Sequence, residues 1–428
     1  METLESYLER KYEELRLLNG CLRTPLPLLL PRSVMEVIRH KFQLTAALKA
    51  DHALHDWTAT ETGWADIATH RSGPFAFRYD YQRADLDVRG PSFYELKEGT
   101  SETIYTSSGM AAISALVLAA TRTIGAADIL MLPGSYGETQ ELIEDYAAGL
   151  RQVTLLRSPQ QTLAERSSSF RLMLLDSSAP ASTFEATLRC ASLAVDLLIF
   201  DTTCFSGGSG RIRRVLAGAR RWGVPLVMVR SHNKLDSLGA EYGRLGSVVF
   251  VDWKTEAASR DQSGITNLPQ ETRNAVRLLG GAALPAHFPP YVGTARYREL
   301  TNKRLAAILR NSRRARRYFA SRLPGLTAEL NFEHGLYVTL ASRQPLDEAA
   351  AKQAAAAMSH DLSQAGLPIR HAGSFGFDFA AAEWFHNATT DRYSVRIAAS
   401  DLPTAIWDDL TVAIAKWWSV HQGRAAAA

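Results

Sequence analysis

The sequence predicts an α/β protein with a large domain built on a mainly parallel seven-stranded sheet and a smaller C-terminal α+β domain. Two observations lead to this prediction. Between residues 101 and 251, short apolar runs alternate with segments of helical periodicity, which is typical of parallel strands joined by helices. After residue 295, one long helical segment leads into short strand-like and helical segments. In such a sheet, ligands bind at the carboxyl ends of the strands, so the site is expected there.

Each element follows from a local pattern. An amphipathic helix over residues 1–22 stops near a glycine and a proline-marked segment, and a second helix covers 34–54. Residues 58–99 lack clean periodicity and are expected to be irregular. In the large domain, strands are expected at 127–132, 152–156, 171–175, 197–201, 226–229 and 247–251, and helices at 109–121, 139–150, 183–190 and 211–222.

The same patterns continue into the smaller domain. A helix is expected over residues 295–323, antiparallel strands at 335–340 and 393–397, and helices at 346–365 and 403–420. The chain therefore divides into an N-terminal helical arm over residues 1–60, a large α/β domain over 61–290 and a small α+β domain over 291–428.

Composition excludes several classes of function. Hydrophobic residues make up 46% and charged residues 21%, as in ordinary enzymes, and the net charge of +4 shows no nucleic-acid footprint. The three cysteines lie far apart without CxxC spacing, which argues against a disulfide scaffold or a metal site and fits a reducing cytoplasm. The longest early apolar run, Leu26–Leu30, is too short to cross a membrane. We expect a cytoplasmic protein whose partner is a small molecule.

Two buried strands end in side chains with complementary chemistry. The segment Pro225–Lys234 runs from apolar residues into a polar end that closes on Lys234, and Asp196–Asp201 runs into the carboxylate of Asp201. A poorly solvated lysine can present a neutral amine that forms an imine with an aldehyde. A buried aspartate can keep a pyridine nitrogen protonated. Pyridoxal 5'-phosphate requires both groups, so the pair predicts this cofactor.

Two loops supply further groups that the cofactor needs. The turn Thr106–Ala112 places Ser108, Gly109 and Met110 at a helix start, where backbone N–H groups and the helix dipole favour a phosphate. Tyr136 lies in a glycine-flanked loop after a strand, where its ring can stack on a planar cofactor.

Together these segments resemble the Cys/Met-metabolism (trans-sulfuration) family of pyridoxal phosphate enzymes, which have fold type I, the aspartate aminotransferase-like fold. The resemblance implies that Ser108, Gly109 and Met110 form the phosphate turn and that Tyr136 stacks on the ring. It implies that Asp201 and Thr203 correspond to the family's Asp-x-Thr. The segment Ser231–Lys234 is similar to Ser-x-Thr-Lys, with Ser231 and Asn233 binding the cofactor and Lys234 attached to it.

The resemblance extends into the smaller domain and also shows departures. It implies that Ser374 lines the substrate site and that Arg396 clamps the substrate α-carboxylate through a bidentate fork. The family's Tyr-Ser-Arg pattern ahead of the phosphate turn is absent, and Tyr81 is the substrate-binding candidate in the corresponding region. Asn233 replaces a hydroxyl residue. His232 is expected on a strand, where alternation of side chains favours a structural role.

The implied reaction is elimination or replacement at the γ or β carbon of an amino acid with a leaving group, through a vinylglycine-type intermediate. Lys234, Asp201 and Tyr136 are the catalytic candidates, and Lys234 is the expected base. An aminotransferase on the same scaffold and a non-catalytic binding subunit remain alternatives. The resemblance also implies a homo-oligomer, at least a dimer, with shared active sites.

Overall fold

The computed structural model describes the chain outside several short gaps; the described residues are 2–53, 70–78, 86–95, 101–155, 163–164, 167, 169–252, 263–323, 328–329, 335–340, 342, 344–387 and 391–425. The chain forms two compact units. The large unit contains His52–Asn233 and Tyr242–Gly293. The small unit contains Met1–Asp51, Lys234–Glu241 and Thr294–Ala428. The N-terminal helices and the short segment that begins with Lys234 therefore belong to the same unit as the C-terminal part of the chain. The predicted boundaries at residues 60 and 290 stay predictions.

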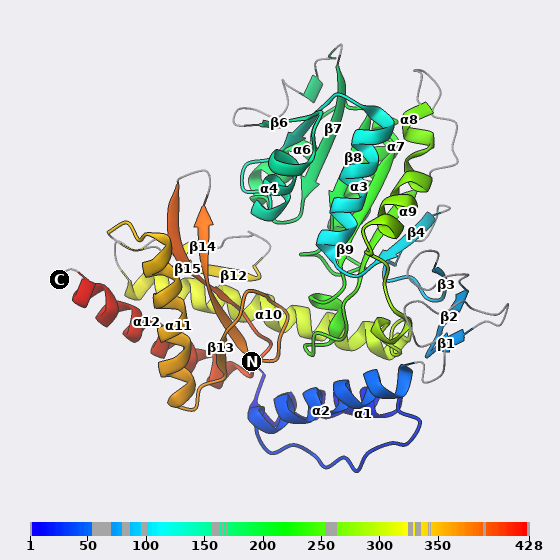
Figure 1. The fold of residues 1–428 in the computed structure, drawn as a ribbon. Helices are drawn as coiled ribbons and strands as arrows, with labels where there is room; N and C mark the ends of the chain where they lie inside the picture. The colour runs from blue at the N-terminus through cyan, green and yellow to red at the C-terminus, as the bar shows by residue number, and fades with distance from the viewer. Residues whose placement is uncertain are drawn as a thin grey trace. The chain divides into compact units, whose positions relative to one another are not determined.

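The large unit is built on a seven-stranded sheet of order β4-β10-β9-β8-β7-β5-β6. Figure 1 labels β4, β9, β8, β7 and β6 of this sheet. Pairing is parallel from β9 through β6, and β10 pairs antiparallel with both β9 and β4, so the predicted mainly parallel sheet is confirmed. The strands are β4 (Ser101–Thr106), β5 (Ala127–Met131), β6 (Leu150–Thr154), β7 (Phe170–Asp176), β8 (Leu197–Asp201), β9 (Leu226–Ser231) and β10 (Gly246–Val251).

Helices cover both faces of this sheet because its strands are apolar on both sides. Ile199 and Val227 face one side and pack with α3 (Gly109–Ile124), α4 (Gly137–Tyr146), α8 (Ser263–Thr266) and α9 (Leu268–Leu278). Phe200 and Met228 face the other side and pack with α6 (Ala181–Leu188) and α7 (Gly210–Trp222). Alternate residues of one strand thus belong to two separate cores, as expected for a doubly covered sheet.

The strand β4 was not located in the sequence, because its residues Ser101–Thr106 are mostly polar. The expected helix over 139–150 ends earlier, at Tyr146, since Leu150 already begins β6. A separate three-stranded antiparallel sheet is formed by β1 (His70–Ser72), β2 (Phe75–Arg78) and β3 (Asp87–Arg89). This sheet lies within residues 58–99, so the prediction that the stretch is irregular was wrong where these three strands form. The short 3-10 helix η3 (Pro285–His287) also belongs to the large unit.

The small unit contains a five-stranded sheet of order β11-β12-β15-β14-β13. Its strands are β11 (Ala328–Glu329), β12 (Tyr337–Leu340), β13 (Ile369–His371), β14 (Ala380–Asn387) and β15 (Arg392–Ala398). The two strands expected in this domain, β12 and β15, pair antiparallel as predicted. β13 and β14 were missed; the first has only three residues, and the second begins with three alanines, which have low strand propensity.

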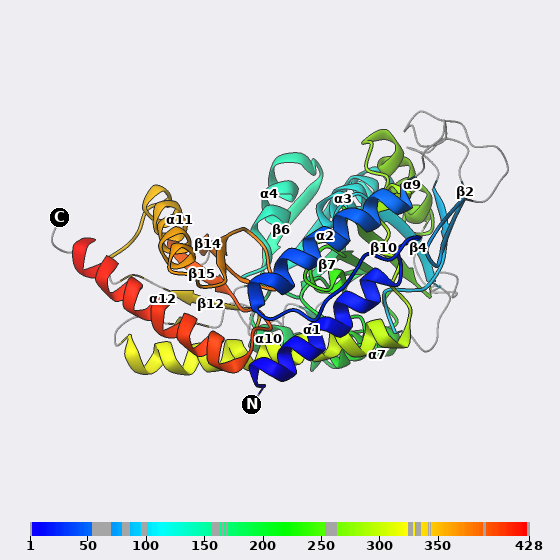
Figure 2. The ribbon, with the colours of Figure 1, turned by 90° about the horizontal axis from the view of Figure 1, so that it is seen from below.

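Among the described residues, the longer helices of the small unit are α1 (Leu4–Asn19), α2 (Val34–His52), α10 (Ala295–Arg322), α11 (Glu348–Gln364) and α12 (Thr404–Ala425). Figure 2 shows α12 running beside α10, where the indole nitrogen of Trp407 donates to Asn311 O at 2.7 Å. The short 3-10 helix η2 (Leu235–Ser237) follows Lys234. Among the described residues, the structure contains no helix of the length and apolar character that a membrane span requires.

Candidate active site

In the large unit, the predicted phosphate turn begins α3. The Ser108 hydroxyl caps this helix by accepting from Ala111 N at 3.0 Å, and the Thr106 hydroxyl donates to Ser108 O at 2.8 Å. The amides of Gly109 and Met110 lie in the first helical turn, where helix geometry provides no intrahelical acceptor. The turn therefore has the backbone arrangement that binds an anion.

Two glycines allow this turn to approach the neighbouring strands. A Cβ at Gly109 would lie 2.8 Å from Ser231 Cβ, at the end of β9. A Cβ at Gly246 would lie 2.2 Å from Ser108 O. Neither position has room for a side chain, so Gly109 lies directly against Ser231 and Gly246 lies directly against Ser108.

Thr203 links the ends of β8 and β9. Its hydroxyl accepts from Ser231 N at 3.1 Å, and its own N–H donates to Asp201 Oδ1 at 2.7 Å. The Asn233 side-chain oxygen accepts from Leu245 N at 3.1 Å, so this oxygen caps the backbone before β10. Asp201, Thr203 and Ser231 thus form one connected group.

A second carboxyl group lies beside Asp201. Asp176 ends β7 and pairs in register with Asp201 at the end of β8, and both are buried. Burial, followed by the neighbouring Asp176 carboxylate, raises the pKa of Asp201 to about 7, although Thr203 and Arg230 act in the opposite direction. Burial also raises the pKa of Asp176.

Asp176 also positions the predicted ring-stacking residue. Its Oδ2 accepts from Tyr136 N at 2.6 Å, and its Oδ1 accepts from Ser178 N at 2.7 Å. Tyr136 precedes the first residue of α4 and is half-buried. Asp176 was missed in the sequence, although Leu174-Leu175-Asp176 carries the same signal, an apolar strand ending in a carboxylate, that identified Asp201.

These groups fit pyridoxal phosphate. Two buried carboxyl groups side by side are stabilised by a cationic group, which a protonated pyridine nitrogen provides. The helix turn at Ser108 suits the phosphate. Among the described residues, no group of three or more His, Cys, Asp or Glu side chains is placed to hold a metal ion.

Two neighbouring side chains have structural partners. His232 Nε2 lies 2.8 Å from Ser247 Oγ, and its ring packs against the Phe93 ring, with centroids 3.8 Å apart and planes tilted by 30°. These contacts favour the structural role expected for it. Arg230 is 1% exposed and donates to the carbonyl oxygens of Thr202 and Phe205 at 2.8 and 2.7 Å. Its guanidinium therefore fixes the backbone that follows Asp201.

In the small unit, Lys234 is half-buried and lies three residues beyond the end of β9. Its Nζ donates to Ser374 Oγ at 2.5 Å and lies 5.7 Å from the centre of the Phe375 ring. A Cβ at Gly376 would lie 2.8 Å from Lys234 O. The structure thus brings together Lys234 and Ser374, which are 140 residues apart in sequence.

Arg396 lies on β15 with a partner that the sequence did not reveal. Its Nε donates to Glu383 Oε1 on β14 at 2.7 Å, and both side chains are about nine-tenths buried. The guanidinium lies between the rings of Tyr337 and Phe385, at 4.4 and 4.6 Å from their centres. Its position is therefore fixed on several sides. Tyr81, the remaining predicted residue, lies outside the described residues.

Comparison with known proteins gives a fold but no sequence family. No family model matches the chain, and no curated protein matches it. Among solved structures, it is similar to cystathionine gamma synthase from Xanthomonas oryzae pv. oryzae in complex with cystathionine, with a TM-score of 0.50 and 18% identity over 88% of this chain and 98% of that one.

Two further structures show the same similarity. For metB from Corynebacterium glutamicum the TM-score is 0.51 and the identity 17%, over 87% of this chain and 97% of that one. For cystathionine gamma-lyase from yeast the values are 0.50 and 14%, over 87% and 98%. The chain has the fold of these enzymes, so the predicted fold and the resemblance at the level of fold are confirmed.

Proposed function

We propose that the chain is a pyridoxal phosphate-dependent enzyme that catalyses elimination or replacement at the γ or β carbon of an amino acid. One observation carries the proposal. The sheet of the large unit gathers, at the ends of β8 and β9, an anion-binding helix turn and a buried carboxyl pair, and β9 continues within three residues into Lys234. The fold shared with cystathionine gamma-synthase and gamma-lyase supports the class of reaction.

In this proposal the cofactor is held by the residues that the resemblance implies. The amides of Gly109 and Met110 and the hydroxyl groups of Ser108 and Ser231 would hold the phosphate. Tyr136 would stack on the ring. Asp201 would carry the negative charge opposite the ring nitrogen, and Thr203 orients that carboxyl group through its N–H. When bound, pyridoxal phosphate supplies a sink for the electrons released at the substrate Cα.

The chain's own side chains would bind the substrate and move its protons. The Lys234 amine would take the proton from Cα and return it elsewhere, and its hydrogen bond to Ser374 Oγ sets the direction of the amine. Arg396 would bind the substrate carboxylate, and Glu383 together with the rings of Tyr337 and Phe385 holds the guanidinium in place.

Product analysis tests the proposal. Purified protein supplied with pyridoxal phosphate should show a visible absorption band, and a panel of C4 amino acids with different γ-substituents should yield a released leaving group with a keto acid, or a replacement product. Stable conversion of the cofactor to its pyridoxamine form would instead establish an aminotransferase. A colourless protein that takes up no cofactor would contradict both.

We also propose that the protein acts as a homo-oligomer, at least a dimer. Apolar side chains are exposed along the segment that joins α1 to α2 and on α2 itself, including Leu29 (77%), Leu30 (55%) and Phe42 (44%). Exposed apolar side chains close together in a chain are typical of protein contacts. Light scattering should give the mass of a dimer or larger, and Leu29→Glu should lower it. A monomeric wild-type protein would overturn this part.

A further inference from the structure

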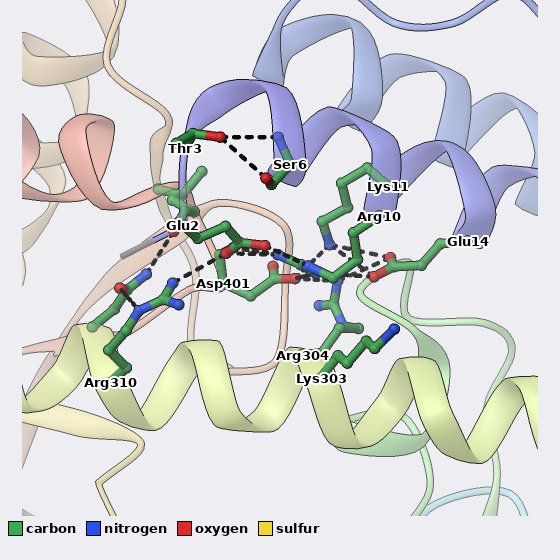
Figure 3. Close-up of polar contacts among 12 residues, drawn as sticks. Glu2, Thr3, Ser6, Arg10, Lys11, Glu14, Lys303, Arg304, Arg310 and Asp401 are labelled. Atoms are coloured by element: carbon green, nitrogen blue, oxygen red, sulfur yellow. Dashed lines mark hydrogen bonds and ion pairs between the residues drawn. The ribbon is translucent and has the colours of Figure 1, made fainter.

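The small unit contains a cluster of buried charges outside the candidate active site. We use the name buried ion cluster for Arg10, Lys11, Glu14, Lys41, Arg304, Asp378 and Asp401, with Glu2 at its rim. Figure 3 shows side chains from α1 and α10 converging on Asp401. Its carboxylate lies 2.6 Å from both Arg10 Nη1 and Lys11 Nζ, and Asp378 lies 2.5 Å from Lys11 Nζ.

The charges of the cluster balance. Its four cations are matched by three carboxylates within the cluster and by Glu2 at the rim. The side chains of Lys11, Glu14 and Asp401 have no exposed surface. Lys41 pairs with both Glu14 and Asp378, and Arg304 pairs with Asp378. Replacing a buried ion network with packed apolar side chains is often neutral or stabilising, so stability alone does not explain such a cluster.

The cluster bonds directly to the segment that follows Lys234. Lys41 Nζ donates to Leu238 O at 2.7 Å. Leu238 has a φ of +51°, a left-handed conformation that is uncommon for a leucine and that needs support from its surroundings. A Cβ at Gly239 would lie 2.5 Å from Arg304 Nη2 and 2.8 Å from Asp378 Oδ1, so the cluster also packs against this backbone.

The cluster bonds equally to the segment that carries Ser374. Arg304 Nη2 donates to Gly376 O at 2.8 Å, and Asp378 closes the same segment. Gly376 packs on the Lys234 carbonyl, and Ser374 accepts from the Lys234 amine. Both segments that contact Lys234 therefore receive a hydrogen bond from a cation of the cluster.

We propose that the buried ion cluster holds the Lys234 amine in its reactive position, with Lys41 and Arg304 as positioning residues. The proposal rests on the proposed function, in which Lys234 is the reacting amine. Charged donors give short, directional bonds to carbonyl oxygens, whereas apolar packing permits small shifts. Since α1 and α2 supply four of the cluster residues, the N-terminal helices belong to the machinery that orients Lys234.

The test uses the full chain without cofactor and the variant Lys41→Met, which keeps side-chain length and removes the donor. In this variant, the exchange rate of the backbone amides of residues 235–239 should increase relative to the wild type. The increase should be on the order of tenfold larger than that of amides elsewhere in the small unit. The rate of acylation of Lys234, measured by mass spectrometry relative to the exposed Lys416, should change by a similar factor. Lys41→Arg should restore both values.

Arg314→Met is the matched control, because Arg314 pairs with Asp408 at 2.5 Å near the surface, on the same helix as Arg304. It should leave both measurements unchanged. With cofactor bound, Lys41→Met should lower kcat on the order of 100-fold with little change in KM, as expected for a misplaced reacting group.

If Lys41→Met does not fold, hydrogen exchange of the wild-type protein tests the positioning role of the cluster. Amides 235–239 should exchange in the same opening event as residues 10–14 of α1. Independent opening, or unchanged exchange and acylation in a folded Lys41→Met, would overturn the positioning role. Because these readouts need no cofactor, they separate this failure from that of the proposed function, which is tested by cofactor attachment to Lys234.

Discussion

Buried carboxyl groups occur in two regions of this protein, and their pKa values move in opposite directions. In the small unit, burial raises the pKa of Asp401, but the charges of Arg304, Lys11 and Arg10 outweigh it and hold the value below the usual range. In the large unit, burial and Asp176 raise the pKa of Asp201 to about 7. The first set is already neutralised by its own cations. An added cation would stabilise the second set, as expected of a binding site.

The largest effect on stability is expected for Asp401→Asn. This change leaves Arg10, Lys11 and Arg304 with one carboxylate fewer in a buried network. Breaking a buried ion network in this way costs about 3–5 kcal/mol. Denaturant unfolding at pH 7, followed by a probe in the small unit, measures the loss. A change below about 1 kcal/mol would show that the cluster is not the balanced network described here.

The same replacement at Asp201 should have the opposite sign. In the cofactor-free protein, Asp201→Asn should raise the free energy of unfolding at pH 8 by up to about 4 kcal/mol, since the pKa rises from 3.8 to about 7 at about 1.4 kcal/mol per unit. Affinity for pyridoxal phosphate should fall, because the partner of the ring nitrogen loses its charge.

The pH dependence of that gain follows from the direction of the shift. Between about pH 4 and pH 7 the native Asp201 keeps its proton while the unfolded chain releases it. The wild type therefore loses stability as pH rises through this window, and the gain from Asp201→Asn should vanish near pH 4. Urea unfolding at pH 4, 6 and 8 checks this, and a gain that is constant with pH would contradict it.

The parts of the fold and of the candidate site that could be predicted from the sequence are those marked by a pattern of neighbouring residues. The ends of β8 and β9 were found because an apolar run followed by a polar residue is visible within ten positions. The buried ion cluster was not found, because Lys11 and Asp378 are 367 residues apart and no local pattern links them. Arg396 was identified from its motif, but its partner Glu383 lies on another strand, and cross-strand register depends on the folded sheet.

A smaller effect is expected for Asp176→Asn. Removing this carboxylate takes away the second cause of the raised Asp201 pKa, so the upper limit of the pH window in which stability falls should move to lower pH. Asparagine has one acceptor oxygen, so the bond from Tyr136 N or from Ser178 N is lost, and this costs about 1 kcal/mol. Unfolding as a function of pH would show the shift, and an unchanged profile would mean that the two carboxyl groups titrate independently.

The smallest effect is expected for Arg314→Met, which breaks the partly exposed pair with Asp408. Such pairs contribute about 0–1 kcal/mol, and salt screens them. Unfolding in low and high salt measures this contribution. If Arg314→Met lowered the free energy of unfolding as much as Asp401→Asn, exposed and buried ion pairs would contribute equally to the stability of this protein, which would contradict the expected difference.

Covalent attachment of pyridoxal phosphate to Lys234 is the most direct test of the proposed function. The full chain should be incubated with the cofactor, reduced with borohydride, digested and analysed by mass spectrometry, with Lys234→Ala as the control. We expect a pyridoxyl group on the peptide that contains Lys234, and no pyridoxyl group on the corresponding peptide of the Lys234→Ala control. Labelling of another lysine, or no labelling, would contradict the proposed function.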